Sequence, residues 1–484
     1  MTALPAKYPT AALIDGAWVT SADTFAVTNP ATGKEISRVP NLGAKETKLA
    51  IDAASKALPA WSAKTAKERS IILRRWFDLI TNNTESLAQL MTAEQGKPLA
   101  ESRGEVAYGA SFVEWFAEEG KRAYGKTIPT TAASRRYITI KQPVGVAAAI
   151  TPWNFPIAMI TRKVACALAA GCTIVVKPSE ETPLCALAVA KLAQDAGVPA
   201  GVFNVITTMD APAVGKVMCD DDRVRKLTFT GSTAVGKALY RQCADTVKKL
   251  TLELGGNAPL IVFDDADIDQ AVAGAMASKY RNAGQTCVCA NRILVQAGIY
   301  DRFADALLKA VGNLHVAPGT DPKSTIGPLI NADATQKVQQ LLADAVAKGA
   351  KIRTGGTGDA AACGPLFVQP SVVTGVTANM DIVNEEIFGP VAALMRFETE
   401  DEAVHLANAT PFGLAAYLFS QNLSRAWRVA ERVEAGMIGV NEGIFSNEVV
   451  PFGGVKQSGL GREGAAEGLD EYLETKFICL GGIS

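Results

Sequence analysis

Histidine is nearly absent from this chain of 484 residues, which has 2 histidines, His315 and His405. Both lie in polar stretches with the apolar spacing of helices, and we expect both imidazoles to be solvated. A cysteine or serine nucleophile usually takes its proton-accepting base from histidine. If the chain carries such a nucleophile, another kind of side chain must therefore handle the protons.

An excess of either charge is also missing, since 48 Lys and Arg oppose 49 Asp and Glu. Nucleic-acid binding favours a basic surface, so we expect no nucleic-acid partner. No apolar run reaches the ~18 residues that a membrane helix needs, and "VACALAAGCTIVV" is typical of a buried helix that leads into a buried strand. The amino-terminal stretch "MTALPAKYPT" lacks the apolar core of a signal peptide. We therefore expect a cytoplasmic protein with no membrane partner.

We expect no disulfide framework, because the 9 cysteines are odd in number, irregularly spaced and spread over a large chain. Two of them, Cys287 and Cys289, lie one residue apart in "GQTCVCAN". Two thiols supply half of the ligands of a structural zinc site, and neither histidine stands at finger spacing, so we expect no metal. The pair is then a redox pair or a nucleophile with a neighbour.

The chain is too long for one core, which predicts at least two domains. Residues 45–125 show helical spacing of apolar residues. From residue 144, strands such as "TIVVKP" alternate with helices such as "PLCALAVAKLAQDAG", which predicts a doubly wound parallel sheet. The pattern restarts with the predicted helix "IDQAVAGAMASKYRNAG" and predicts a second α/β domain from about residue 257 to 455.

The stretch "FTGSTAVGKA" places a glycine-bounded turn between a predicted strand and a predicted helix. Free amides and the positive end of the helix dipole suit a phosphate there. The stretch departs from two known motifs, because Thr233 replaces the middle glycine of a dinucleotide fingerprint and Ala238 replaces the Mg²⁺-binding hydroxyl of a P-loop. A phosphate site and a plain strand–helix turn both remain open, and a P-loop-like nucleotide-binding protein is the weaker interpretation.

Two polar residues stand in apolar surroundings. Glu253 ends the apolar strand of "LTLELGGNAP" and is a candidate ribose ligand, a desolvated base of raised pKa, or a paired strand carboxylate. Asn154 in "ITPWNFP" lies in a turn held by two prolines, where its amide would stabilise an oxyanion or cap the next helix.

A series of stretches follows in order: "PWNFP", "VVKPSEETP", "FTGSTAVG", "LELGGNAP", "GQTCVCANR", "EEIFGP" and "PFGGVKQSGLGRE". In this order the chain resembles the aldehyde dehydrogenase superfamily over essentially its whole length. The resemblance implies an α/β fold with a doubly wound cofactor domain, an α/β catalytic domain and a small β oligomerisation element. These are expected at residues 1–121 and 144–256, at 257–467, and at 122–143 with 468–484. A homodimer or homotetramer is also implied.

In that family the first cysteine of the motif, here Cys287, is the nucleophile that forms a thioester. The resemblance implies that the Asn154 amide holds the oxyanion and that Glu253 activates the hydrolytic water. Hydride passes to NAD, with NADP as the alternative. The implied cofactor contacts are Trp153, Lys177, Ser179, Glu180, Gly231, Ser232, Glu386 and Phe388.

Within the superfamily, the chain most resembles the members that oxidise succinate semialdehyde to succinate. Their carboxylate-binding residues correspond here to Arg162, Arg281 and Ser446, although the arginines are alternatively salt-bridge residues of a surface or interface. Glutarate semialdehyde and a broader set of aldehydes are alternative substrates, and a non-catalytic protein on this scaffold is an alternative of another class. Cys289 is a candidate redox partner of Cys287, or a small packed residue.

Overall fold

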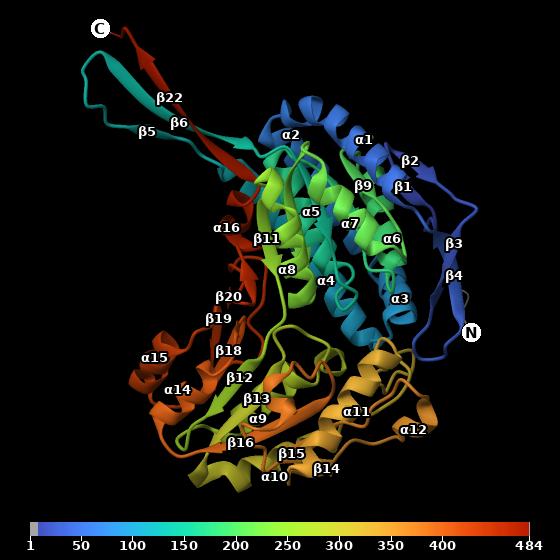
Figure 1. Ribbon diagram of the computed structural model, residues 1–484, viewed down its shortest axis with the longest axis vertical. Coiled ribbons are helices and arrows are strands. Elements are labelled where there is room, and N and C mark those ends of the chain that lie inside the picture. The colour runs from blue at the N-terminus through green and yellow to red at the C-terminus, as the bar shows by residue number, and fades with distance from the viewer. Residues whose placement is uncertain (1–7, 484) are drawn as a thin grey trace.

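Two open sheets, each flanked by helices, form the two halves of the computed structural model, which describes residues 8–483 (Figure 1). The first sheet contains β1 (Ala12–Ile14), β2 (Ala17–Val19), β7 (Val146–Ile150), β8 (Thr173–Lys177), β9 (Phe203–Val205), β10 (Val224–Thr230), β11 (Lys249–Glu253) and β21 (Gly459–Leu460). Their order is β2-β1-β9-β8-β7-β10-β11-β21, and the strands from β9 to β11 are parallel. This order confirms the predicted doubly wound parallel sheet.

Helices cover both faces of this sheet. They are α1 (Ala44–Ser62), α2 (Ala66–Asn82), α3 (Thr84–Gln95), α4 (Leu99–Glu119), α5 (Ala158–Ala170), α6 (Pro183–Asp195), α7 (Ala211–Asp220) and α8 (Thr233–Gln242). Side chains of β7 alternate between two cores: Ala147 and Ala149 pack with α2, α4, α5 and α6, whereas Val146 and Ala148 pack with α1, α7 and α8. Burial on both faces explains why β7 and β8 are continuous apolar runs.

The second sheet confirms the second α/β domain and has the order β14-β15-β16-β13-β12-β18-β19. It is parallel except for β14, which pairs antiparallel with β15. Its strands are β12 (Ala258–Val262), β13 (Ala290–Gln296), β14 (Lys351–Thr354), β15 (Ser371–Thr374), β16 (Val391–Phe397), β18 (Ala415–Phe419) and β19 (Met437–Val440). The helices around it are α9 (Ile268–Lys279), α10 (Tyr300–Val311), α11 (Ala332–Ala347), α12 (Ala360–Cys363), α13 (Asp381–Asn384), α14 (Glu400–Asn408) and α15 (Leu423–Arg432).

An arm of three antiparallel strands projects from the first half of the molecule (Figure 1). It consists of β5 (Lys126–Ile128), β6 (Arg135–Pro143) and β22 (Leu473–Gly481) in the order β22-β6-β5. The oligomerisation role expected for this region stays a prediction. The remaining short elements are β3 (Thr24–Thr28), β4 (Glu35–Pro40), β17 (Phe412–Gly413), β20 (Val455–Lys456) and α16 (Ala465–Asp470).

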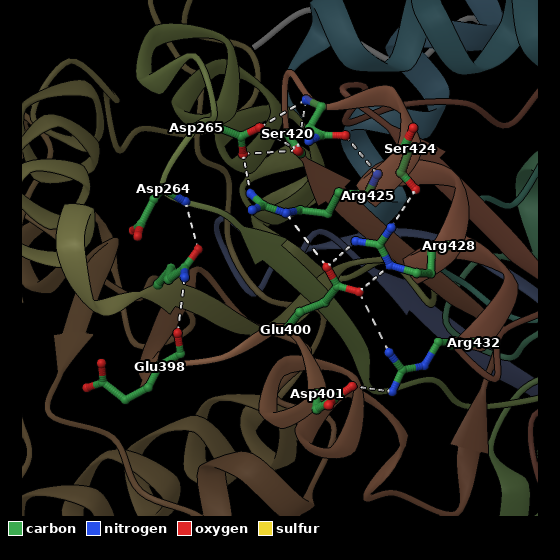
Figure 2. A network of polar contacts seen from close by, with 12 residues as sticks. Asp264, Asp265, Glu398, Glu400, Asp401, Ser420, Ser424, Arg425, Arg428 and Arg432 are labelled. Carbon is green, nitrogen blue, oxygen red and sulfur yellow. Dashed lines mark hydrogen bonds and ion pairs between the residues drawn. The ribbon is translucent and has the colours of Figure 1, made fainter.

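A polar network joins α14 and α15 on the outside of the second half (Figure 2). The Glu400 carboxylate accepts two hydrogen bonds from Arg428, each of 2.8 Å, and also pairs with Arg425 and Arg432. Arg425 in turn donates to Asp265 at 2.7 Å. Exposed pairs of this kind contribute ~0–1 kcal/mol each, so the network fixes how the two helices lie rather than supplying much stability.

Two expectations about local structure are wrong. His315 is not helical, because α10 ends at Val311 and His315 forms a β-bridge with Thr357. The helix expected through "YRNAG" ends as α9 at Lys279, since a left-handed turn follows it. Within residues 8–483, no helix has the length and apolar character needed to cross a membrane.

Candidate active site

A cavity of about 540 Å³ lies where the two halves of the molecule meet. The carboxyl ends of parallel strands share one edge of a sheet, so the segments that follow β7, β10 and β11 all reach this cavity. Lys177, the last residue of β8, and the following Ser179 and Glu180 are not among the residues that line the cavity. The predicted site residues that line it are Trp153, Asn154, Arg162, Gly231, Ser232, Glu253, Arg281, Cys287, Glu386, Phe388 and Ser446.

Cys287 lies half-buried in the loop before β13. Burial first, and then the charge of Glu386, raises the pKa of its thiol to about 12, against the lowering effect of Arg162. A thiol of this pKa is protonated at neutral pH, so a proton acceptor must act before it can attack. The loop packs tightly on Gly256, where a Cβ atom would lie 2.5 Å from the Cys287 carbonyl oxygen. This contact explains the second glycine of "LELGGNAP".

Asn154 directs its side chain towards the same loop. Its Nδ2 donates to the Gln285 carbonyl at 3.0 Å, and its own carbonyl accepts from Lys97 Nζ at 2.7 Å and from Asn282 Nδ2 at 3.0 Å. The backbone N–H of Cys287 makes no hydrogen bond among residues 8–483. Asn154 and Cys287 both line the cavity, so the Asn154 amide and the Cys287 N–H are candidate donors for an oxyanion.

The alternative that Asn154 caps the next helix is excluded. Helix α5 begins at Ala158 without a side-chain cap from its own segment. The Glu105 carboxylate of α4 accepts instead from the backbone N–H groups of Ile157 and Ala158, at 2.9 and 3.3 Å. Because a distant residue satisfies the start of α5, the Asn154 amide is not needed there; it donates to the Gln285 carbonyl and lines the cavity.

Glu253 is the last residue of β11 and is only 2% exposed. Neither of its carboxylate oxygens has a hydrogen-bond partner among residues 8–483, which excludes a paired strand carboxylate. Burial, followed by the charge of Glu463, raises the pKa of Glu253 well above its usual range. A buried carboxyl without a partner, in a cavity with a thiol, has the properties of a general base.

A buried ion-pair cluster beside Glu253 was missed by sequence reasoning. Glu463 Oε2 lies 2.6 Å from Arg162 Nε, and Glu463 Oε1 pairs with Lys163 Nζ. These cations hold the pKa of Glu463 down at about 2. Glu463 ends the quoted stretch "PFGGVKQSGLGRE", but nothing in that stretch indicates a partner in α5. Arg162 therefore already has an ion-pair partner before any substrate binds.

Arg281 differs from Arg162 in this respect. It is half-buried, and its guanidinium lies 5.4 Å from the centre of the Phe155 ring. Among residues 8–483 it has no ion pair and no side-chain hydrogen bond. Neither arginine is thus a surface salt-bridge residue, and Arg281 has a free charge in the same cavity as Ser446, which is also half-buried.

Features suited to a dinucleotide occupy the other end of the cavity. Ser232 caps α8 by accepting from Val235 N, and a Cβ atom at Gly231 would lie 2.5 Å from the Phe229 ring, so glycine is needed at this turn. Glu386 accepts from Gly256 N at 3.1 Å, and burial raises its pKa to about 7.

Aromatic and charged groups complete this end of the cavity. The rings of Trp153 and Phe388 meet edge to face at 5.7 Å. Outside the cavity, Lys177 Nζ forms an ion pair of 2.7 Å with Glu180. The start of α11 also reaches the cavity, which no sequence pattern had indicated, through Asn331, Asp333, Ala334 and Lys337.

Cys289 lies buried at the start of β13, and its thiol donates towards the Lys279 carbonyl at 3.4 Å. A disulfide with Cys287 would require this thiol to turn away from that carbonyl. Within residues 8–483, no group of three or more His, Cys, Asp and Glu side chains is arranged to hold a metal ion.

Comparisons with known proteins agree with this geometry. The aldehyde dehydrogenase family pattern matches residues 18–478. The chain is 58% identical to succinate-semialdehyde dehydrogenase (NADP(+)) of Escherichia coli, covering 97% of each protein. It is 57% identical to glutarate-semialdehyde dehydrogenase of Pseudomonas aeruginosa, covering 98% of each. The solved structure of succinate-semialdehyde dehydrogenase from Burkholderia pseudomallei superimposes with a TM-score of 0.97 at 58% identity, covering 99% of both chains. The chain therefore belongs to the aldehyde dehydrogenase family.

Proposed function

We propose that the protein oxidises succinate semialdehyde to succinate with NAD(P) as hydride acceptor. The observation that carries the proposal is that the free guanidinium of Arg281 and the thiol of Cys287 line one cavity. A semialdehyde needs both groups, because its distal carboxylate is costly to bury without a partner. The names of the E. coli and B. pseudomallei relatives support the same substrate.

Each step of the oxidation is assigned to a residue of the cavity. The Cys287 thiol gives up its proton to solvent, and its sulfur attacks the aldehyde carbon while the Asn154 amide and the Cys287 N–H donate to the developing oxyanion. The same carbon then loses a hydride, which leaves the thioester on Cys287. Bound NAD(P) supplies the hydride acceptor. Glu253 then takes a proton from the water that hydrolyses the thioester, and its pKa, which burial raises, makes the carboxylate a stronger base than an exposed one.

The turn at Gly231–Ser232, the Trp153–Phe388 pair and Glu386 are the groups that would hold the dinucleotide. The helix start at Ser232 suits a phosphate, and the Glu386 carboxylate suits a ribose hydroxyl. These contacts support a cofactor site at this end of the cavity, opposite Arg281.

The substrate proposal is tested by comparing kcat/KM for succinate semialdehyde, glutarate semialdehyde and butanal, followed by NAD(P)H formation. We expect both semialdehydes to react faster than butanal. Glutarate semialdehyde should remain a substrate, because one methylene changes the transition-state energy by only ~1–3 kcal/mol. A preference for butanal would contradict the proposal.

We propose NAD over NADP, because the Glu180 carboxylate would repel the 2′-phosphate of NADP and can accept from the 2′-hydroxyl of NAD. Lys177 already neutralises part of that charge through their ion pair. Glu180→Ser should therefore raise kcat/KM for NADP relative to NAD, by about tenfold for one relieved charge contact of ~1.4 kcal/mol. If the unchanged protein already prefers NADP, Glu180 does not exclude the 2′-phosphate and the proposal is wrong.

We also propose that a mild oxidant joins Cys287 to Cys289 and blocks attack reversibly. The residues are two apart, but the Cys289 thiol faces Lys279, so the loop must bend. Peroxide should inactivate the protein, dithiothreitol should restore it, and Cys289→Ala should lose most of the recovery. Equal recovery with and without Cys289 would rule out the disulfide.

The assembly is proposed to be a cytoplasmic homodimer or homotetramer. The arm supports this, because β22 and β5 are its edge strands and Phe477 on β22 is 57% exposed. An exposed edge strand can pair with the sheet of another copy. Light scattering gives the mass in solution, and a monomer would contradict the proposal.

A further inference from the structure

A second chamber of about 290 Å³ continues from the catalytic cavity on the far side of Arg281. The two spaces share Tyr108, Phe155, Arg281 and Ser446 in their walls. Glu101 of α4 lines the second chamber and is not among the residues around the thiol. Glu101 contacts the catalytic cavity indirectly, through the backbone next to the shared residue Arg281.

The backbone after Arg281 adopts an uncommon shape. Asn282 and Ala283 both have left-handed conformations, with φ of 52° and 53°. Residues other than glycine rarely adopt this region, so neighbouring contacts must hold it. The turn fixes the position of the Arg281 backbone, and a change in its conformation would move the guanidinium away from the cavity.

Besides bonds to Gln285 within the loop, three contacts with distant residues hold the turn at Asn282. The Glu101 carboxylate accepts from the Asn282 backbone N–H at 2.8 Å. Gln95 Nε2 donates to the Asn282 side chain at 3.1 Å, and Asn282 Nδ2 donates to the Asn154 carbonyl at 3.0 Å. The turn thus connects Arg281 at one end of the substrate space with Asn154 at the other.

Glu101 is the contact that fixes the backbone amide directly after Arg281. Its carboxyl is desolvated, and burial raises its pKa, while Lys97 and Arg281 act in the opposite direction. The hydrogen bond from Asn282 needs only an acceptor oxygen, so it does not depend on the charge of Glu101. The charge has a separate effect, because it offsets part of the positive field of Arg281.

We propose that Glu101 is a positioning residue that places Arg281 for the distal carboxylate of the substrate by anchoring the left-handed turn at Asn282. The inference rests on the proposed function, in which Arg281 binds that carboxylate. It makes Glu101 a determinant of selectivity for ω-carboxylated aldehydes, although Glu101 does not touch the reacting carbon.

The test measures KM and kcat for succinate semialdehyde and butanal in Glu101→Ala and Glu101→Gln. Glu101→Ala should raise KM for succinate semialdehyde about fivefold, equivalent to ~1 kcal/mol at 1.4 kcal/mol per factor of ten, and leave butanal within about twofold. Glu101→Gln keeps an acceptor oxygen and should return KM to the original value or below it. Glu114→Ala, on the exposed side of α4, is the matched control and should change neither substrate.

A double-mutant cycle separates this inference from the proposed function. In an Arg281→Ala background, Glu101→Ala should raise KM no further, because there is no guanidinium left to place. If Arg281→Ala raises KM but Glu101→Ala does not, or if the two effects add, the positioning role of Glu101 is wrong and the proposed function is unaffected. If Arg281→Ala itself leaves KM unchanged, the carboxylate site is wrong and the inference falls with it.

Glu101→Asp guards against a variant that fails to fold. Aspartate keeps the charge but withdraws the carboxylate by one methylene, so KM for succinate semialdehyde should rise as it does for alanine. An unchanged KM in both Glu101→Asp and Glu101→Ala would show that Glu101 does not position Arg281, and an equal loss with butanal would show a purely structural role.

Discussion

Cys287→Ala is expected to lower the rate of aldehyde oxidation by about 10³-fold or more, because among residues 8–483 Cys287 is the only cysteine that lines the cavity and a thioester requires a thiol. Cys289→Ala is the matched control and should keep most of the activity, since its thiol is buried and faces the Lys279 carbonyl. Steady-state NADH formation with succinate semialdehyde measures both variants.

Glu253→Gln should separate the two halves of the same reaction. Glutamine cannot take a proton from water, so the thioester should form once and then hydrolyse slowly. Stopped-flow absorbance should show a burst of NADH close to one equivalent per site, followed by little turnover. Equal losses in the two cysteine variants, together with no burst in Glu253→Gln, would contradict the roles assigned to all three residues.

The two sheets could be predicted from local patterns. A strand such as β8 is apolar along its whole length because helices cover both faces, and that signal needs no knowledge of the rest of the chain. The position of the cavity also follows, because parallel strands bring their carboxyl ends to one edge. Asn154, Glu253 and Gly231 lie there for this reason.

What the sequence left open depends on contacts between distant segments. Lys163 and Glu463 are 300 positions apart in the sequence. Because they pair, the Glu463 carboxylate has an ion-pair partner, whereas the Glu253 carboxylate has no hydrogen-bond partner within residues 8–483. The turn at Asn282 is held by a contact with Glu101 of α4, which the local sequence does not reveal. The local sequence alone therefore predicts that α9 continues through the turn. Helix propensity is a weak local preference, and these long-range hydrogen bonds override it.

The two arginines of the cavity also depend on contacts with distant segments. From the sequence, both were expected to bind the substrate carboxylate, but their partners in the structure differ. Arg162→Ala would remove one of the two cations that pair with the buried Glu463 carboxylate, and it would empty the space that the guanidinium fills beside the Phe452 ring. We therefore expect Arg162→Ala to lower thermal stability and to reduce activity with every aldehyde. Thermal unfolding, followed with and without substrate, measures the first effect.

Arg281→Ala should instead change selectivity with little change in stability, because Arg281 has no ion pair to break within residues 8–483. A charge-assisted bond from arginine to a carboxylate contributes ~1.5–3 kcal/mol, so KM for succinate semialdehyde should rise about tenfold or more. Butanal has no carboxylate, and its kcat/KM should stay nearly constant. Arg281→Lys keeps the charge but loses the planar guanidinium that can donate two parallel hydrogen bonds. Its KM for succinate semialdehyde should lie between those of the unchanged protein and Arg281→Ala. Equal losses with succinate semialdehyde and butanal in Arg281→Ala would show that the substrate carboxylate binds elsewhere.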